Sequence, residues 1–199
     1  MAKLIYYYGV MNSAKTALLL TTAHNYENTG RKIVAMKPNI DTRDSKGKIS
    51  SRIGLSREAI IFTEKDSLIN IVEKFISDNL EKPSAILIDE VQFCTKEHIK
   101  ELAFIVDNMN IDVLCYGLKS TYTGELFEAS AKLFILADKI ERIKQVCSFC
   151  NKKAIMNLKI RNNKPVYSGE SISIGDINNC EEYYIPVCRQ HYNRPYIKK

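Results

Sequence analysis

"IYYYGVMNSAKTALLL", residues 5–20, predicts a β-strand that passes through a tight loop into an α-helix. Gly9, Lys15 and Thr16 match the phosphate-loop pattern G-x-x-x-x-G-K-[ST], in which backbone N–H groups at a helix N-terminus surround a phosphate. Ala14 stands where this pattern has its second glycine. Alanine keeps the N–H donor, but its Cβ causes strain if the loop requires a positive φ. We expect a phosphate site here; the alternative is an ordinary strand–turn–helix.

Two carboxylates after the apolar stretch "SAILI" supply a second signal. Asp89 and Glu90 would stand at the carboxyl end of a buried strand, which is where ligands bind in open α/β sheets. We expect Asp89 to hold Mg²⁺ together with the Thr16 hydroxyl, and Glu90 to accept a proton from an attacking hydroxyl. The alternative is a pair of solvated carboxylates at a strand end.

The first two-thirds of the chain alternates strand-like and helix-like patterns around a polar loop at residues 39–56. This alternation predicts an α/β fold, a phosphate-loop core in which helices cover both faces of a parallel sheet. From Glu141 onward the pattern is strand-like, so we expect a core over residues 1–140 and a small β-rich domain over residues 141–199. The expected strands are 3–8, 31–38, 58–62, 84–90 and 111–118, and the expected helices are 15–29, one capped by Asp66, and 95–108.

Four residues of the β-rich part have the spacing of a metal site. Cys147-Ser-Phe-Cys150 and Cys188-Arg-Gln-His191 form a CxxC and a CxxH pair, each able to bind one metal from a tight turn. Together they predict a closed Cys₃His zinc site, which holds structure rather than catalysing. Cys180 is an alternative ligand, and free thiols or a disulfide are the alternative states.

The composition narrows the class of protein. The chain has 199 residues, 45% of them hydrophobic, and a formal net charge of +6. We expect a cytoplasmic protein without a membrane span, because no secretory signal and no run of roughly 18 apolar residues is apparent. The positive charge permits nucleic acid as a partner, but no basic stripe with interleaved aromatic residues supports it.

Five segments in this order resemble motifs of the thymidine kinase family shared by many bacteria and the animal cytosol. They are "GVMNSAKTALLL", "KPNIDTRDSKGKISSRIG", "IDEVQF", "CYGLKSTYTGELF" and "LADKIERIKQVCSFC", and the resemblance extends over nearly the whole chain. It implies a RecA-like core and a zinc-held domain whose lasso loop covers the nucleoside. It also implies transfer of the γ-phosphoryl group of ATP to the 5′-hydroxyl of thymidine, and often of deoxyuridine, by a homotetramer that dTTP inhibits.

The same resemblance implies roles for individual residues. Glu90 would be the catalytic proton acceptor. Mg²⁺ would lie near Thr16, Asp89 and Asp41. The residues implied to bind the ATP phosphates are Gly9, Val10, Met11, Asn12, Ser13, Ala14, Lys15, Thr16, Arg43, Asp89 and Gln92. Those implied to line the nucleoside pocket are Met11, Phe93, Leu118, Tyr122, Phe127 and Tyr184.

Three features depart from the family pattern: Ala14 in the loop, Lys119 where many members have aspartate, and a longer lasso end at residues 174–188. They leave two other functions open, a deoxynucleoside kinase with altered base preference and a nucleotide-binding protein with weakened catalysis. The basic composition leaves a third open, a nucleic-acid-binding ATPase with a zinc ribbon. Retention of Lys15, Asp89 and Glu90 favours an active kinase over an idle site.

Overall fold

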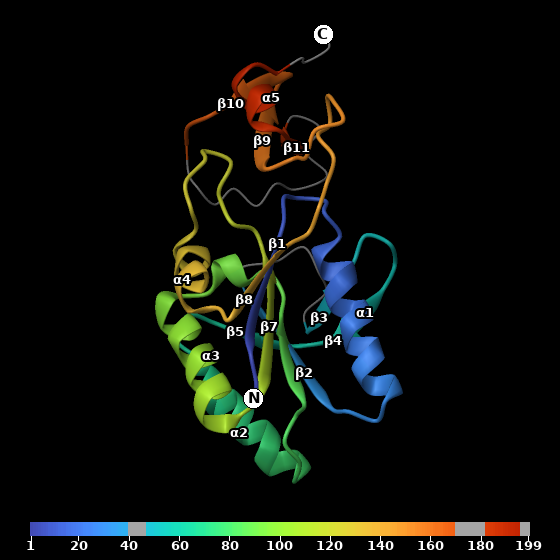
Figure 1. Ribbon diagram of the computed structural model, residues 1–199, viewed down its shortest axis with the longest axis vertical. Coiled ribbons are helices and arrows are strands. Elements are labelled where there is room, and N and C mark those ends of the chain that lie inside the picture. Colours follow the sequence, from blue (N-terminus) through green and yellow to red (C-terminus); the bar gives the residue numbers. More distant parts are fainter. Residues whose placement is uncertain (40–46, 170–181, 196–199) are drawn as a thin grey trace.

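The computed structural model describes residues 1–39, 47–169 and 182–195, so Asp41, Arg43 and Cys180 lie outside the described residues. A sheet flanked by helices forms the larger part of the molecule, and a smaller β-rich domain lies beyond one end of this sheet (Figure 1). The expected α/β core with a small second domain is confirmed. Within the described ranges, none of the helices combines the length and apolar character needed to cross a membrane.

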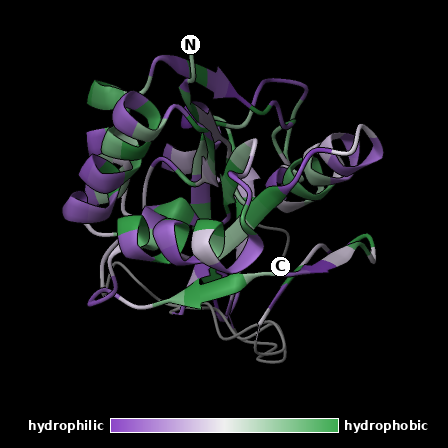
Figure 2. Ribbon diagram, turned by 90° about the horizontal axis from the view of Figure 1, so that it is seen from below, coloured by the Kyte–Doolittle hydropathy of each residue, from purple (hydrophilic) through white to green (hydrophobic). Residues whose placement is uncertain are grey.

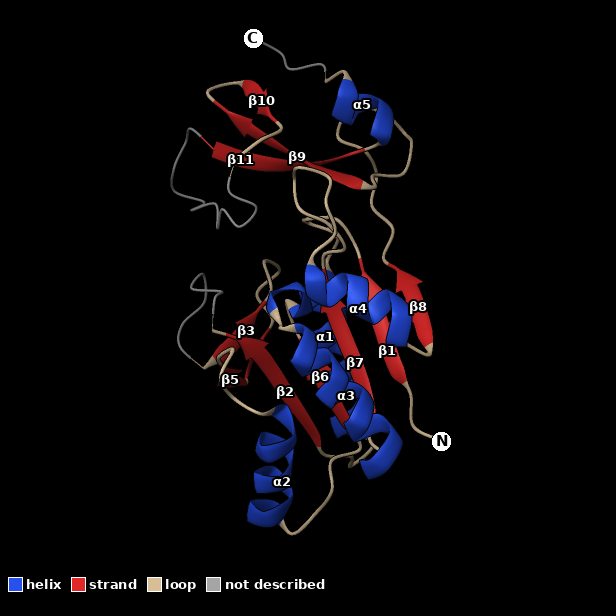
Figure 3. Cartoon of the chain, turned by 90° about the vertical axis from the view of Figure 1, so that its left-hand side faces the viewer, coloured by secondary structure: helices blue, strands red, loops and turns tan. Residues whose placement is uncertain are grey.

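The core sheet has six strands in the order β5-β2-β6-β7-β1-β8, and every neighbouring pair is parallel. Because all six strands point the same way, their carboxyl ends form one edge, which faces the small domain (Figure 3). The strands are β1 Leu4–Tyr8, β2 Ile33–Pro38, β5 Ile60–Phe62, β6 Ala85–Ile88, β7 Asp112–Gly117 and β8 Lys139–Arg142.

Helices cover both faces of this sheet, because alternate residues of each buried strand point to opposite sides. One face packs on α1 and the other on α2, α3 and α4, in two separate clusters of buried side chains. Hydrophilic and hydrophobic stretches alternate around these helices in Figure 2, as expected for helices with one buried face. The helices are α1 Lys15–Asn28, α2 Leu68–Asn79, the short 3₁₀ turn η1 Val91–Phe93, α3 Lys96–Met109 and α4 Glu128–Leu136.

Two local expectations were wrong. Ser67, not Asp66, caps α2, because the Ser67 hydroxyl accepts the Asn70 N–H while the Asp66 carboxylate accepts the N–H and hydroxyl of Thr63. The segment expected as a polar loop contains an antiparallel hairpin of β3 Lys48–Ser50 and β4 Ser56–Glu58.

The small domain has a three-stranded antiparallel sheet in the order β10-β9-β11, followed by helix α5. Its bounds are β9 Met156–Arg161, β10 Lys164–Val166, β11 Glu182–Val187 and α5 Arg189–Asn193. The boundary expected after residue 140 falls inside β8, since Glu141 and Arg142 pair with Tyr7 and Tyr8 of the core sheet. We propose that the core extends to Arg142.

Candidate functional site

The phosphate loop joins β1 to α1, and its backbone is left-handed at two positions without glycine. Ala14 is the N-cap of α1 with φ 61°, and Asn12 has φ 62°. Ala14 therefore replaces the glycine of the sequence pattern at a position where the loop backbone has a positive φ. For an L-residue with a Cβ, this conformation costs roughly 1–2 kcal/mol.

Lys15 and Thr16 begin the helix and point into the loop and toward the sheet edge. Lys15 is 8% exposed, and its Nζ donates to the Val10 carbonyl at 2.9 Å. Gly9 is required for close packing here, because a Cβ at this position would lie 2.2 Å from the Ser13 Oγ. This Oγ is buried and without a hydrogen-bond partner among the described residues. The loop is thus closely packed around a helix N-terminus that favours anions.

Asp89 meets the phosphate loop from the end of β6. The Thr16 hydroxyl donates to the Asp89 carboxylate at 3.1 Å, and the Asp89 N–H donates to the Met36 carbonyl. Burial, and next the neighbouring Glu90, raise the pKa of Asp89 to about 7. A cation beside these oxygen atoms would favour the ionised carboxylate, so Thr16 and Asp89 fit the oxygen ligands that Mg²⁺ prefers.

Glu90 is held in place by Gln92. The backbone at Glu90 is left-handed, with φ 49°, and the Gln92 amide donates to the Glu90 carboxylate at 2.6 Å. The oxygen of the same amide, Gln92 Oε1, accepts a hydrogen bond from the Leu118 N–H at 2.9 Å. Gly117 leaves room for this contact, because a Cβ there would lie 2.5 Å from the Gln92 Oε1. The β6 and β7 ends together orient the carboxylate that we expect to act as a base.

The aromatic residues expected in the nucleoside pocket form two ring pairs. Phe93 and Phe127 lie edge-to-face at 6.0 Å, both within the core. Tyr122 and Tyr184 also lie at 6.0 Å, and they join the core to β11 of the small domain. Leu118 lies between these segments in sequence and is buried, with its carbonyl accepting the hydroxyls of Tyr6 and Ser130.

Lys159 of β9 lies beside the second ring pair, and no sequence motif predicts this position. Its side chain is 3% exposed, and its Nζ is 5.2 Å from the Tyr122 ring centre and 5.8 Å from that of Tyr184. Glu182 pairs with the same ammonium at 2.9 Å. A buried cation against two ring faces fixes the positions of the rings. Only the packing of β9 against β11 reveals this role, because an isolated lysine in a strand is ordinary.

Lys159→Met is expected to raise the KM for nucleoside about tenfold and leave kcat within about twofold, because it removes the cation that positions both rings. Glu182 keeps a partner in this variant, since Arg161 also bonds it. Steady-state kinetics with varied nucleoside give the two constants. Lys159→Arg should restore most of the KM, and Lys164→Met, an exposed site on β10, serves as the control. An unchanged KM in Lys159→Met would contradict the role.

Hydrogen bonds connect the small domain to the core site. The Met11 N–H of the phosphate loop donates to Asn157 Oδ1 of β9 at 2.8 Å. The Tyr192 hydroxyl of α5 donates to the Tyr122 carbonyl at 2.7 Å. From the hairpin, Arg52 donates to the side chain of Asn12. The small domain and the hairpin therefore both contact the loop expected to hold phosphate.

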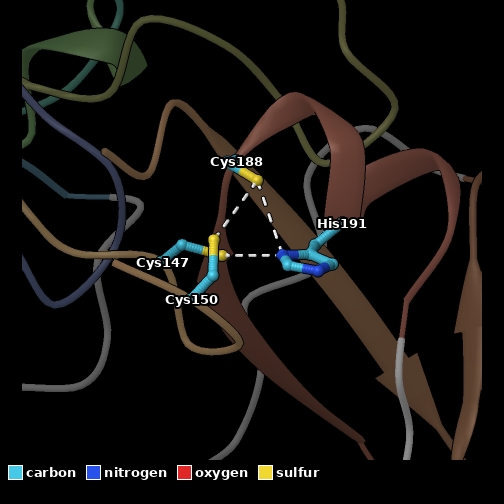
Figure 4. Close-up of side chains that lie close together, drawn as sticks. All are labelled: Cys147, Cys150, Cys188 and His191. Carbon is cyan, nitrogen blue, oxygen red and sulfur yellow. Dashed lines mark hydrogen bonds between the residues drawn. The ribbon is translucent and has the colours of Figure 1, made fainter. Parts of the chain in front are cut away.

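The four predicted metal ligands converge at the start of α5 and the turn before β9 (Figure 4). Their ligand atoms lie within 4.8 Å of one another. The His191 Nδ1 is 3.4 Å from Cys147 Sγ and 3.5 Å from Cys188 Sγ, and the sulfurs of Cys150 and Cys188 are 4.0 Å apart. Thiolates about 2.3 Å from one tetrahedral ion would lie roughly 3.8 Å apart, so the cluster can hold a metal ion.

The environment of Cys147 favours the thiolate that a metal needs. Burial raises the pKa of Cys147, but hydrogen bonds from the backbone N–H groups of Phe149 and Cys188 and from the His191 side chain outweigh burial and lower the pKa to about 6. By contrast, burial raises the pKa of Cys94 and Cys115, which lie in the hydrophobic core. The cysteines of the cluster and those of the core therefore lie in different environments.

Ala14→Gly is expected to stabilise the protein by about 0.5–1 kcal/mol, because it removes the strain of a left-handed backbone at alanine. Part of this gain is lost, since glycine has more conformational freedom in the unfolded chain. Chemical denaturation measures the difference. Ala17→Gly in the first turns of α1 is the matched control and should destabilise by about 0.5–1 kcal/mol. Equal destabilisation by both variants would show that Ala14 is not strained.

Known proteins are similar to this chain over nearly its whole length. Residues 2–192 match the sequence model of the family described as thymidine kinase. The chain is 48% identical to the thymidine kinase of Streptococcus pyogenes serotype M3, over 99% of this chain and 100% of the relative. It is 47% identical to the thymidine kinase of Streptococcus gordonii, over 99% of each chain, and 46% identical to that of Streptococcus agalactiae, over 99% and 100%. The chain belongs to the thymidine kinase family.

Proposed function

We propose that this protein transfers the γ-phosphoryl group of ATP to the 5′-hydroxyl of thymidine, and of deoxyuridine, to form the monophosphate for nucleotide salvage. The observation that carries the proposal is the contact between Thr16 and Asp89, with Glu90 next in sequence and Lys15 in the loop. Phosphoryl transfer requires a phosphate cradle, cationic neutralisation and an oriented hydroxyl, and these residues supply each of them. Family membership supports thymidine as the acceptor.

In this mechanism the loop residues 9–16 surround the donor phosphates with backbone N–H groups, and Lys15 adds positive charge. Glu90 accepts the proton of the attacking hydroxyl, and Gln92 keeps its carboxylate oriented. Thr16 and Asp89 would hold Mg²⁺, which would supply positive charge beside the phosphate oxygens. Met11, Leu118 and the ring pairs Phe93–Phe127 and Tyr122–Tyr184 enclose the nucleoside.

The Cys₃His cluster belongs to the same proposal as a structural zinc site. Three cysteines and one histidine are ligands that zinc prefers, and four protein ligands leave no open position for catalysis. We also propose a cytoplasmic location, because a reducing compartment keeps such thiols available for metal. The homotetramer, its inhibition by dTTP, and the contributions of Asp41 and Arg43 rest on the family resemblance.

The test is ATP-dependent conversion of thymidine to its monophosphate by the purified protein, beside a panel of other nucleosides. Turnover highest on thymidine is the expected result. Turnover only on another nucleoside would replace thymidine by that acceptor. The alternative of nucleotide binding with little turnover draws on the left-handed Ala14. Activity that appears only in Ala14→Gly would support this alternative and contradict the proposal.

A further inference from the structure

A small open cavity of about 30 Å³ lies next to the phosphate loop, and the proposed mechanism does not use it. Its lining residues come from the carboxyl ends of neighbouring core strands and from the first segment of the small domain. They are Tyr8, Gly9, Val10, Lys119, Arg142 and Ile155. Gly9 and Val10 belong to the phosphate loop, so the cavity shares a wall with the expected ATP site.

Two positive charges meet in this cavity without a negative partner among the described residues. Lys119 and Arg142 are both half-buried, and neither forms an ion pair within the ranges that the structure covers. Glu141, the nearest carboxylate in sequence to Arg142, pairs with Lys139 instead. Burial, and next the neighbouring Arg142, lower the pKa of the Lys119 ammonium. Two cations that lie close together in a partly desolvated cavity are unfavourable without a counter-charge.

We propose that Lys119 and Arg142 form a binding site for a phosphate group beside the phosphate loop. A phosphate in the cavity would neutralise both cations and accept hydrogen bonds from an ammonium and from a planar guanidinium, which suits phosphate oxygens. Arg142 donates one bond to the Ala154 carbonyl at 2.6 Å, and a guanidinium has further N–H donors for a ligand. This bond also holds the side chain at the cavity wall. The site does not depend on which nucleoside the protein phosphorylates.

The phosphate has two chemical sources: free inorganic phosphate, or a phosphate of the nucleotide bound at the loop. The first source makes the cavity a second anion site. The second makes Lys119 and Arg142 part of nucleotide recognition. Both sources would bind to the same two cations. A substitution of one cation therefore tests whether the site exists, whichever source supplies the phosphate.

The experiment titrates inorganic phosphate, and separately a non-hydrolysable ATP analogue, into the natural protein and Lys119→Met at constant ionic strength, followed by calorimetry. Lys119→Met is expected to weaken one of the two affinities about tenfold, since it removes one of two charged donors. Lys74→Met, an exposed site on α2 with the same change of charge, is the control and should change neither affinity more than twofold.

Repeating the phosphate titration with saturating analogue separates the two sources. A Lys119-dependent phosphate signal that persists beside the analogue identifies free phosphate as the ligand. Weaker analogue binding in Lys119→Met, with no such persistent signal, identifies a phosphate of the nucleotide. Both affinities within twofold of the natural protein would overturn the proposal. The melting temperature in phosphate-free buffer tests whether Lys119→Met is folded. We expect this temperature to be no lower than that of the natural protein, because the variant loses the repulsion between Lys119 and Arg142.

Discussion

Glu90→Gln is expected to lower kcat about 10²- to 10⁴-fold and to leave ATP binding within a few-fold of the natural protein. A general base contributes a rate factor of this size, and an amide cannot accept the proton of the attacking hydroxyl. The substitution keeps the size of the side chain and its acceptor oxygen for the Gln92 amide, which donates to Glu90 at 2.6 Å. The loss should therefore fall on the chemical step, and KM for both substrates should change little.

The measurement is steady-state kinetics together with calorimetric titration of a non-hydrolysable ATP analogue. Glu97→Gln is the matched control, because Glu97 is an exposed carboxylate on α3 whose pair with Lys100 is a surface ion pair of little energetic weight. It should keep full turnover. Turnover of Glu90→Gln equal to that of Glu97→Gln would remove Glu90 from the role of base. Loss of analogue binding as well would show that Glu90 supports the nucleotide site rather than the proton transfer.

The core could be predicted from the sequence because its signals are local. The strand–loop–helix at residues 5–20 and the apolar stretch before Asp89 each follow from short-range periodicity, and the structure contains both elements within one or two residues of their expected ends. The sequence predicts strain at Ala14 if the loop requires a positive φ there, and the backbone at Ala14 has φ 61°. The Cys₃His cluster was also predictable, since the spacing of its two pairs already limits how they can meet.

Elements that depend on tertiary contacts were not predictable. α4 was not expected: Phe127 occupies its N-cap without a side-chain bond, so the usual start signal is absent. β8 was divided by the expected boundary because only its pairing with β1 assigns Glu141 and Arg142 to the core. The hairpin of β3 and β4 consists of two three-residue strands, too short for a clear alternating pattern.

The site shows the same division. Lys15, Thr16, Asp89 and Glu90 stand in motifs, and the structure brings the Thr16 and Asp89 side chains into contact although they are far apart in sequence. Asn157 and Lys159 stand in no motif, and their roles arise only because β9 lies against the phosphate loop and the tyrosine pair. A sequence pattern identifies the residues expected to contact phosphate more readily than the residues that hold them in position.

Removal of zinc is expected to unfold the small domain while the core sheet stays folded. The buried cluster of this domain is small, and two of its members, Cys147 and Cys188, are themselves metal ligands. A core of this size does not stabilise an independent unit without a metal or disulfide. Chelation should release about one zinc per chain and expose residues after 143 to protease, whereas the six-stranded sheet keeps its circular dichroism.

The same loss should reach the proposed catalytic site, because the small domain supplies Tyr184 to the ring pair and forms hydrogen bonds with the core. The Tyr192 hydroxyl bonds the Tyr122 carbonyl beside the proposed nucleoside pocket, and Asn157 accepts the Met11 N–H in the proposed phosphate loop. Cys147→Ser should therefore lower zinc content to near zero and weaken nucleoside binding at least tenfold.

Cys94→Ala is the control, because it removes a buried thiol of the core and should keep zinc. It loses some stability through the small cavity that the substitution leaves. A Cys147→Ser protein that retains one zinc per chain would contradict the assignment of this ligand, and a zinc-free protein with normal nucleoside binding would show that the small domain does not position the nucleoside.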